Sequence, residues 1–350
     1  MASHNSTMAL TSMGADITET GEFRDLAFEY ASLILKTYVN VALSFGGIVA
    51  NVINFMVFYT MGVSDGITQN FLILSFFDGM VAATYMVNSI SYTLFYSVFT
   101  AGDHISEILN NIFFATFIGQ HYCLQVSYMT TTVTAVVRCC CVAMPLRVKR
   151  VMTVRRQLII IALFSLNALI VNLIAALLGD TVPLIRPGDN LTQYSDFQDP
   201  MYLICDIMAH SLITVEYIII VVCTIILIYS LYRSSKFREQ SGSSSEAFEK
   251  RNANARETRV VQTILVITTV FIFCNIPYLT LTALRQLVPA VTATGHLWKL
   301  HTIILFVQEA GVLINANANC FGYFYFNTRY RNTLKNLFGK AVNVVKSDHI

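Results

Sequence analysis

Three ionisable side chains lie within or at the end of long apolar stretches of the sequence. Asp78 follows NFLILSFF, and no other charged residue lies between Asp65 and Asp103. Arg138 ends a second apolar stretch (TAVVR), and Glu309 interrupts a third. A charge removed from water needs a partner. An ionisable residue at membrane depth is costly, so each of the three is a candidate functional site.

The elements that position these residues must be strongly apolar. The 350-residue chain is 55% hydrophobic and only 13% charged, with a mean hydropathy of +0.58, whereas about 25% of residues are charged in soluble domains. The charges collect in short segments between the apolar stretches. This pattern indicates a polytopic membrane protein rather than one large water-soluble core. The net charge of +2 gives no reason to expect a nucleic-acid partner.

Seven stretches are long enough to cross a bilayer, which takes about twenty apolar residues. Only helices satisfy their own backbone groups in hydrocarbon, so we expect an all-α membrane protein, a seven-transmembrane helix bundle. No internal repeat is visible, and the odd number of spans argues against a two-fold transporter. The expected spans are residues 35–62, 69–98, 108–137, 157–179, 206–232, 260–284 and 301–326.

The lysine and arginine residues indicate the orientation. Eighteen of the 23 lie in the segments 138–156, 233–259 and 329–346, and five lie on the other side. The positive-inside rule places the eighteen in the cytoplasm and the N-terminus outside. The two N-x-S/T sequons, at Asn5 and Asn190, both fall on the expected outer side and are candidate glycosylation sites. We therefore expect a multi-pass plasma-membrane protein whose C-terminus is cytoplasmic.

The chain divides into three expected regions. Residues 1–34 form an extracellular N-terminal tail, 35–326 the seven-transmembrane domain, and 327–350 a cytoplasmic helix and tail. The first region lacks the basic start and apolar centre of a cleavable signal peptide. In the last region apolar residues recur at helical spacing beside Arg331 and Lys335. That spacing predicts a short amphipathic helix lying on the inner leaflet.

Further polar groups fall near the middle of the expected spans. Small polar residues in membrane helices commonly do no more than hydrogen-bond a neighbouring helix, and for Asn51 alone this interpretation is favoured. A set that includes a carboxylate favours a functional network instead, because an ionisable residue at membrane depth is costly. The set consists of Asn51, Asp78, Ser127, Asn315 and Asn319.

The motifs of successive spans resemble those of the rhodopsin-like (class A) G-protein-coupled receptors. They are GGIVANV in span 1, NFLILSFFD in span 2, Arg138 with Pro145 seven residues later, FIFCNIP in span 6 and NANANCFGY in span 7. The last is similar to the family's N-x-x-x-N-P-x-x-Y pattern, with Cys320 in place of proline. The resemblance covers residues 35–340, and the motifs occur in the family's order, one set per span.

This resemblance implies two sites in the inner half. Asp78, Ser127, Asn315 and Asn319 match a sodium pocket, although Ala316 stands where a serine often contributes. Glu257 matches the acidic partner of the motif arginine across spans 3 and 6. The alternative is that both charges are ordinary interfacial groups in water. The residues implied to act in switching and in coupling to a heterotrimeric G protein are Arg138, Glu257, Tyr229, Tyr323 and Pro277.

The same resemblance implies a pocket for an extracellular small-molecule or peptide ligand. Gln120 stands where amine receptors carry aspartate, which disfavours a simple amine. Glu309 either contacts a cationic ligand or forms an internal pair with Arg285 or His121. Leu313 stands where an opsin has its retinal-binding lysine, so no retinal and no other cofactor are expected. The implied pocket residues are Gln120, His121, Leu124, Tyr217, Asn275, Tyr278, Thr282, Arg285, Glu309, Asn88 and Tyr92.

Several positions depart from the family pattern. Val137 replaces the usual acid before the motif arginine, Asn275 a tryptophan and Val221 a proline. Phe113 replaces the cysteine that starts span 3, so Cys205 lacks its usual partner and no disulfide is expected across the outer face. Losses of this kind are more typical of divergent invertebrate chemosensory receptors than of neuropeptide receptors, which remain the alternative.

Two further classes of protein can be weighed. A cation transporter or channel could use Asp78 and Glu309, but the span count and the motifs argue against it. A membrane enzyme finds no support, since the seven histidines lack metal-ligand spacing and no nucleophile motif is present. The three cysteines after Arg138, Cys139 to Cys141, are expected to fill a helix interface, with acylation as the alternative.

Overall fold

The computed structural model describes residues 2–63, 65–98, 103–143, 152–178, 200–240, 247–288, 290–291 and 295–347. The sequon at Asn190 lies outside these residues, and so do the side chains of Asn5, Cys205 and Glu257. The described part contains eight helices. They are α1 (Ala2–Met61), α2 (Gly66–Val98), α3 (Asp103–Ala143), α5 (Val154–Leu178), α6 (Pro200–Gln240), α7 (Ala247–Leu287), α8 (Trp298–Phe326) and α9 (Thr328–Ser347).

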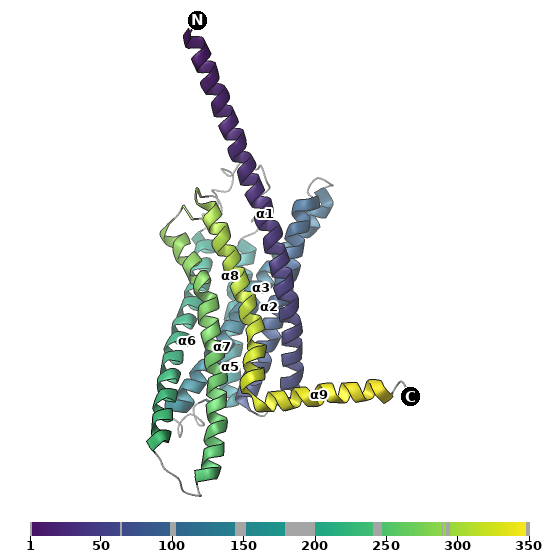
Figure 1. Cartoon of the computed structure of the whole chain (residues 1–350), viewed down its shortest axis with the longest axis vertical. Coiled ribbons are helices and arrows are strands. Elements are labelled where there is room, and N and C mark those ends of the chain that lie inside the picture. Colours follow the sequence, from purple (N-terminus) through teal and green to yellow (C-terminus); the bar gives the residue numbers. More distant parts are fainter. Residues whose placement is uncertain are drawn as a thin grey trace.

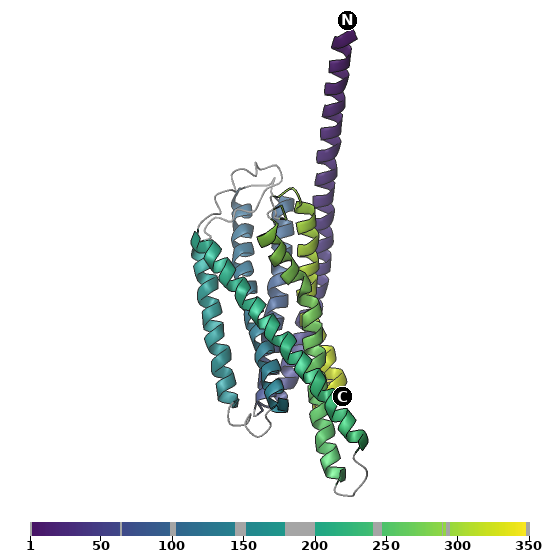
Figure 2. The same cartoon turned by 90° about the vertical axis from the view of Figure 1, so that its left-hand side faces the viewer.

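Helices α1 to α8 form an elongated bundle, and α9 lies across one end of it (Figure 1). Helix α1 continues past the opposite end toward the N-terminus, and α6 crosses its neighbours at a marked tilt (Figure 2). Each expected span corresponds to one of these seven helices. The all-α bundle with a short C-terminal helix is therefore confirmed. The two ends are called the α9 end and the N-terminal end below.

Six helices of the described part are long and apolar enough to cross a membrane, and α3 is the bundle helix that does not meet this criterion. The reason is its position. Helix α3 packs against α2, α5, α6 and α7, and side chains 123–135 are all buried. Because most of α3 faces other helices rather than lipid, it can carry Gln125 and four threonines at buried positions. Helix α5 has the opposite character, with an apolar surface that is largely exposed on the outside of the bundle.

Short-range signals end the helices where the chain must turn. Gly62 follows α1 with φ +84°, a conformation that favours glycine at a helix C-terminus. Asp65 accepts a hydrogen bond from the Ile67 amide at the start of α2, at 3.4 Å. Asn327 separates α8 from α9, and its Oδ1 accepts from the Tyr330 amide at 3.1 Å. The sharp corner between the last two helices therefore has a local cause.

Two of the buried clusters in the described part lie at opposite ends of the bundle. One surrounds Tyr85, Tyr128, Phe271 and Tyr278, toward the N-terminal end. The other lies at the α9 end, where Phe58, Phe71, Tyr323 and Tyr330 pack ring against ring. Leu334 and Leu337 of α9 pack against this second cluster. The apolar face of α9 is thus docked on the bundle, while Phe338 stays exposed.

Candidate functional site

Asp78 lies at the centre of a buried hydrogen-bond network. Its Oδ1 accepts from Ser127 Oγ of α3 at 2.5 Å, and its Oδ2 accepts from Asn319 Nδ2 of α8 at 2.7 Å. The side chain is 2% exposed. Three helices therefore meet at one carboxylate, and all three residues belong to the polar set named from the sequence.

A second set of buried hydrogen bonds, which shares helix α8 with the first, runs from α1 toward α9. Asn51 Nδ2 donates to the carbonyl oxygens of Gly47 and Ala316, at 2.9 and 3.0 Å. Asn54 Nδ2 donates to Asn51 Oδ1 at 3.4 Å, and Tyr330 Oη donates to Asn54 Oδ1 at 2.7 Å. Buried hydrogen bonds thus connect the middle of the bundle to the helix across its end. Asn54 and Tyr330 were absent from the predicted set.

Asn315 takes a different position from the other members. Its side chain is buried, but among the described residues it makes no hydrogen bond to Asp78. The neighbouring Asn317 bonds the carbonyl oxygens of Leu43 and Leu313 instead. A sodium ion would find one carboxylate with hydroxyl and amide oxygens nearby, which suits a hard cation. Each Asp78 oxygen accepts one hydrogen bond, which leaves further lone pairs of the carboxylate for an ion.

Predicted ligand residues of α3, α6 and α7 meet on the N-terminal side of this network. The Tyr128 hydroxyl donates to Asn275 Oδ1, and Asn275 Nδ2 donates to the Phe271 carbonyl at 2.8 Å. Tyr278 stacks on His210 with ring centroids 5.8 Å apart. Leu124 and Tyr217 pack in the same cluster. Asn275, which stands in place of the family's tryptophan, is therefore tied to α3 by a buried polar contact.

The remaining predicted ligand residues are more dispersed. His121 packs edge to face on Phe117, and Tyr92 lies against Phe113 with centroids 5.6 Å apart. Two buried polar atoms, Gln120 Oε1 and Asn88 Nδ2, have no hydrogen-bond partner within the described part. Thr282 is half-buried, and Arg285 is exposed in the last turn of α7.

Glu309 forms an internal ion pair with a partner that the sequence did not suggest. Its Oε1 lies 2.8 Å from Lys36 Nζ, and its Oε2 accepts from Asn40 Nδ2 at 2.7 Å. The sequence named Arg285 or His121 as the internal partner of Glu309, and it did not name Lys36 or Asn40. The correction has a simple cause: α1 packs directly against α8, so a charge at the edge of span 1 reaches the carboxylate.

The predicted switch residues are spread along the bundle, since Pro277 precedes Tyr278 of the cluster toward the N-terminal end. Arg138 is half-buried near the end of α3, and Pro277 lies inside α7. Tyr323 is fully buried, and its ring centroid lies 4.8 Å from the ring centroid of Phe58 and 4.7 Å from that of Phe71. Tyr229 is 65% exposed on the outside of α6. Tyr229 and Tyr323 are therefore not in contact, and the Arg138–Glu257 pair stays a prediction because the Glu257 side chain lies outside the described residues.

The cysteines near Arg138 have distinct surroundings. Cys139 is buried against Cys223 of α6 and Ala135, which agrees with a role in filling the helix interface. Cys140 and Cys141 are half-buried. All seven cysteines whose side chains are described are free thiols.

The sequence reasoning missed Glu216 and the two α1 partners of Glu309, Lys36 and Asn40. Glu216 is 4% exposed, and its Oε2 has no hydrogen-bond partner among the described residues. Its position inside an apolar span was the available signal, because a carboxylate at membrane depth is itself a candidate site. Lys36 lay at the boundary of a span and read as a loop charge.

Seven membrane helices with a polar interior, and an eighth helix across one end, define a seven-transmembrane receptor architecture. The family model described as "7 transmembrane receptor (rhodopsin family)" matches residues 36–319, most of the chain. The protein therefore belongs to this family of G-protein-coupled receptors, which are receptors and not enzymes.

A solved structure agrees with this assignment. The crystal structure of squid rhodopsin superimposes with a TM-score of 0.65 at 17% sequence identity, covering 89% of this chain and 87% of that one. At this identity the likeness shows the fold alone. No curated protein matched the chain.

Proposed function

We propose that the protein is a ligand-activated receptor of the plasma membrane that promotes nucleotide exchange on a heterotrimeric G protein. Its N-terminus is extracellular and its C-terminus cytoplasmic in this proposal. The receptor is chemosensory and its ligand is a small molecule in this proposal. The alternative is a neuropeptide receptor of the same family. The observation that carries the proposal is the buried polar network from Asp78 through α8 and α1 to Tyr330.

This network supports a switching function because it joins elements that belong to both ends of the molecule. Asp78 contacts α3 and α8, and both helices contribute residues to the proposed ligand end. Asn54 and Tyr330 extend the connection to α9, beside the proposed coupling surface around Arg138. A ligand that binds one arrangement of such a network better than another shifts the population toward it. A conformational change at the ligand end would then alter the conformation of the coupling end.

The ligand end is supported by unsatisfied polar atoms. Gln120 Oε1 and Asn88 Nδ2 are buried without a partner in the described part, and a buried polar group of this kind is stabilised by a ligand or water that completes its hydrogen bonds. One group is an acceptor and the other a donor. A ligand with its own donor and acceptor fits this arrangement better than a purely apolar one.

The experiment is a ligand screen in cells that express the protein, with calcium and cyclic-AMP readouts. Arg138→Ala, at the proposed coupling surface, is expected to bind the same ligand but give no response. A ligand response that Arg138→Ala leaves intact contradicts the assigned role of Arg138. Ion currents that persist without G protein contradict the receptor proposal and favour the channel alternative.

A sodium site at Asp78 is part of the same proposal. Replacing sodium chloride by choline chloride is expected to lower the thermal unfolding temperature of the wild-type protein, because an ion bound to the native state stabilises it. Asp78→Asn removes the charge that holds the ion, so its unfolding temperature is expected to be the same in both salts. Equal sodium dependence in both proteins contradicts a site at Asp78.

A further inference from the structure

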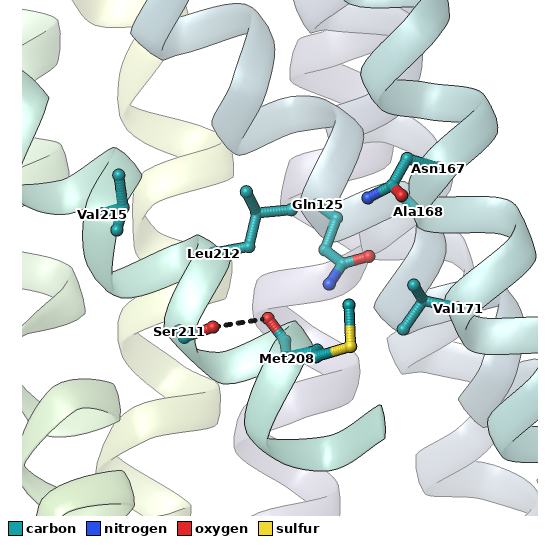
Figure 3. A pocket seen from close by; sticks show the side chains of 8 residues that line it. All are labelled: Gln125, Asn167, Ala168, Val171, Met208, Ser211, Leu212 and Val215. Atoms are coloured by element: carbon teal, nitrogen blue, oxygen red, sulfur yellow. Dashed lines mark hydrogen bonds between the residues drawn. The ribbon is translucent and has the colours of Figure 1, made fainter. Parts of the chain in front are cut away.

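A cavity of about 270 Å³ lies between α3, α5 and α6, and none of the residues assigned above to ligand, sodium or coupling lines it. Its volume is just below the range of ~300–1,000 Å³ typical of ligand pockets, so the part of an occupant that lies inside it must be small. Figure 3 shows the side chains that line it. They are Gln125, Asn167, Ala168, Val171, Met208, Ser211, Leu212 and Val215.

The cavity opens on the outside of the bundle. Met208 and Val215, on one side of it, are each 52% exposed, and Asn167, on the other, is also exposed. Asn167 lies thirteen residues after Val154, the first residue of α5, which is roughly 20 Å along the helix and near the middle of a ~30 Å hydrocarbon layer. A molecule would therefore reach the cavity from the lipid.

Two amides in the cavity have unused hydrogen-bonding groups. Gln125 is 5% exposed, and its Oε1 accepts from Asn172 Nδ2 at 2.9 Å. No described residue accepts from the Gln125 Nε2 group, and none bonds the Asn167 amide. Ser211 Oγ donates to the Met208 carbonyl at 2.9 Å (Figure 3). Hydrocarbon offers no substitute partners, so unsatisfied amides at this depth favour an occupant that bonds them.

The chemistry of the lining defines the occupant. None of the eight lining residues is ionisable, so a carboxylate or an ammonium group would enter without a counter-charge. A hydroxyl group can accept from Gln125 Nε2 and donate to the Asn167 Oδ1 oxygen, which an ether or a ketone cannot do. We propose that this cavity binds a neutral amphiphile, whose hydroxyl lies between Gln125 and Asn167 and whose hydrocarbon part lies along Val171, Met208 and Val215.

The test uses the full-length protein in phosphatidylcholine nanodiscs and a photoactivatable octanol that carries a diazirine. Peptides that carry the label are identified by mass spectrometry. We expect labels on α3, α5 or α6 residues of the cavity. Unlabelled 1-octanol should protect these residues, whereas octane and octanoate at the same membrane concentration should protect them about fivefold less, the equivalent of one neutral hydrogen bond.

Two variants probe the cavity itself. Asn167→Leu removes an exposed, unpartnered amide and should lower labelling about fivefold, as expected for one lost hydrogen bond. Val171→Phe should abolish labelling by filling the space. Leu163→Phe is the matched control, because Leu163 is 61% exposed on α5 but does not line the cavity, and it should label like the wild type.

Discs that also contain cholesterol separate two sources of the hydroxyl. Protection by cholesterol supports a membrane sterol as the occupant, and protection by added octanol alone supports a ligand that arrives from solution. Equal labelling of the wild type, Asn167→Leu and Val171→Phe overturns the proposal. So does equal protection by octanoate, or disulfide cross-linking between copies of Asn167→Cys in the absence of labelling, which would indicate a second copy of the chain on this face.

Discussion

At the scale of single residues, Tyr323 and Tyr330 are neighbouring phenols with different hydrogen-bond states. Their rings lie 5.7 Å apart in one buried cluster. The Tyr330 hydroxyl donates to Asn54 at 2.7 Å, whereas the Tyr323 hydroxyl has no partner in the described part of the chain. A group left unsatisfied in one state and bonded in another favours the second state. Tyr323 is therefore poised to stabilise a different arrangement of the α9 end.

A pair of variants tests this difference. An unsatisfied buried polar group costs about 1–3 kcal/mol, so Tyr323→Phe should raise the thermal unfolding temperature of the ligand-free protein. Tyr330→Phe removes a hydroxyl that is bonded and leaves Asn54 short of a donor, so it should lower that temperature. Both variants lose one oxygen from the same cluster, and each serves as the control for the other. Destabilisation of equal size in both would contradict the assigned states.

The Tyr323→Phe variant should also respond less strongly to ligand. If the hydroxyl gains its partner only in the signalling state, its removal stabilises the resting state relative to the active one. Ligand-evoked calcium or cyclic-AMP signals, normalised to surface expression, measure this effect. A variant that is more stable and yet signals normally would show that the hydroxyl has no role in switching.

At the scale of elements, the sequence predicted each helix of the bundle because membrane spans follow from length and hydropathy. The family resemblance also grouped Asp78 with Ser127 and Asn319, which hydrogen-bond to it, and with Asn315, which does not in the described part of the chain. The sequence could not predict Lys36 as the partner of Glu309. Hydropathy does not specify which faces of α1 and α8 meet, and a lysine at a span boundary looks the same whether it points to water or to a carboxylate.

The packing of α7 on α8 depends on Gly311. A Cβ atom at this position would overlap the carbonyl oxygen of Cys274, three residues before Pro277. Gly311→Ala must therefore separate the two helices and should destabilise the protein by about 1–3 kcal/mol, as overpacking of a core does. Gly339→Ala is the control, because nothing lies within 4 Å of a Cβ there. That change should stabilise α9 slightly, since glycine is unfavourable inside a helix. Thermal unfolding of the two variants would show the opposite signs, and a neutral Gly311→Ala would contradict the close approach.

Two contacts hold α1 against α8 near the N-terminal end. One is the Lys36–Glu309 pair with Asn40. The other is an ion pair in which Lys299 Nζ lies 2.5 Å from Asp25 Oδ1. The same ammonium group lies over the rings of Phe28 and Trp298. Asp25 and Phe28 belong to the stretch that the sequence assigned to the N-terminal tail. These ion pairs and ring contacts hold α1 and α8 together near the N-terminal end of the bundle.

A charge exchange tests the first contact. Glu309→Lys places two ammonium groups together, and the loss of stability should fall between the ~0–1 kcal/mol of a surface pair and the ~3–5 kcal/mol of a buried one, since both side chains are partly exposed. Adding Lys36→Glu restores opposite charges and should recover most of the loss. Thermal unfolding of the single and double variants measures this coupling. A double variant no more stable than Glu309→Lys would show that the pair does not hold α1 to α8.

At the scale of the whole molecule, the basic residues of the described chain separate along the bundle. Arg329 and Arg331 lie at the α9 end, where they bond the carbonyl oxygens of Met61, Phe324 and Tyr325. Lys36 and Lys299 lie toward the opposite end, where each is paired with a carboxylate. The arginines thus satisfy helix ends at one surface, and the lysines are neutralised by acids at the other. Arg285 is also exposed toward that opposite end. Eighteen of the 23 basic residues, however, fall in the segments 138–156, 233–259 and 329–346, the side that the positive-inside rule places in the cytoplasm.

This orientation predicts where sugar can be added. Asn5 and Asn190 should both carry N-linked glycan, because their sequons would face the lumen during synthesis. Peptide N-glycosidase should lower the apparent mass of the wild type, and Asn5→Gln and Asn190→Gln should each remove one step of that change. Ser243→Asn creates the sequon Asn-Ser-Ser in the segment between α6 and α7 and serves as the control. It should stay unmodified if that segment is cytoplasmic, whereas glycan on Ser243→Asn together with none on the natural sequons would show that the N-terminus lies inside.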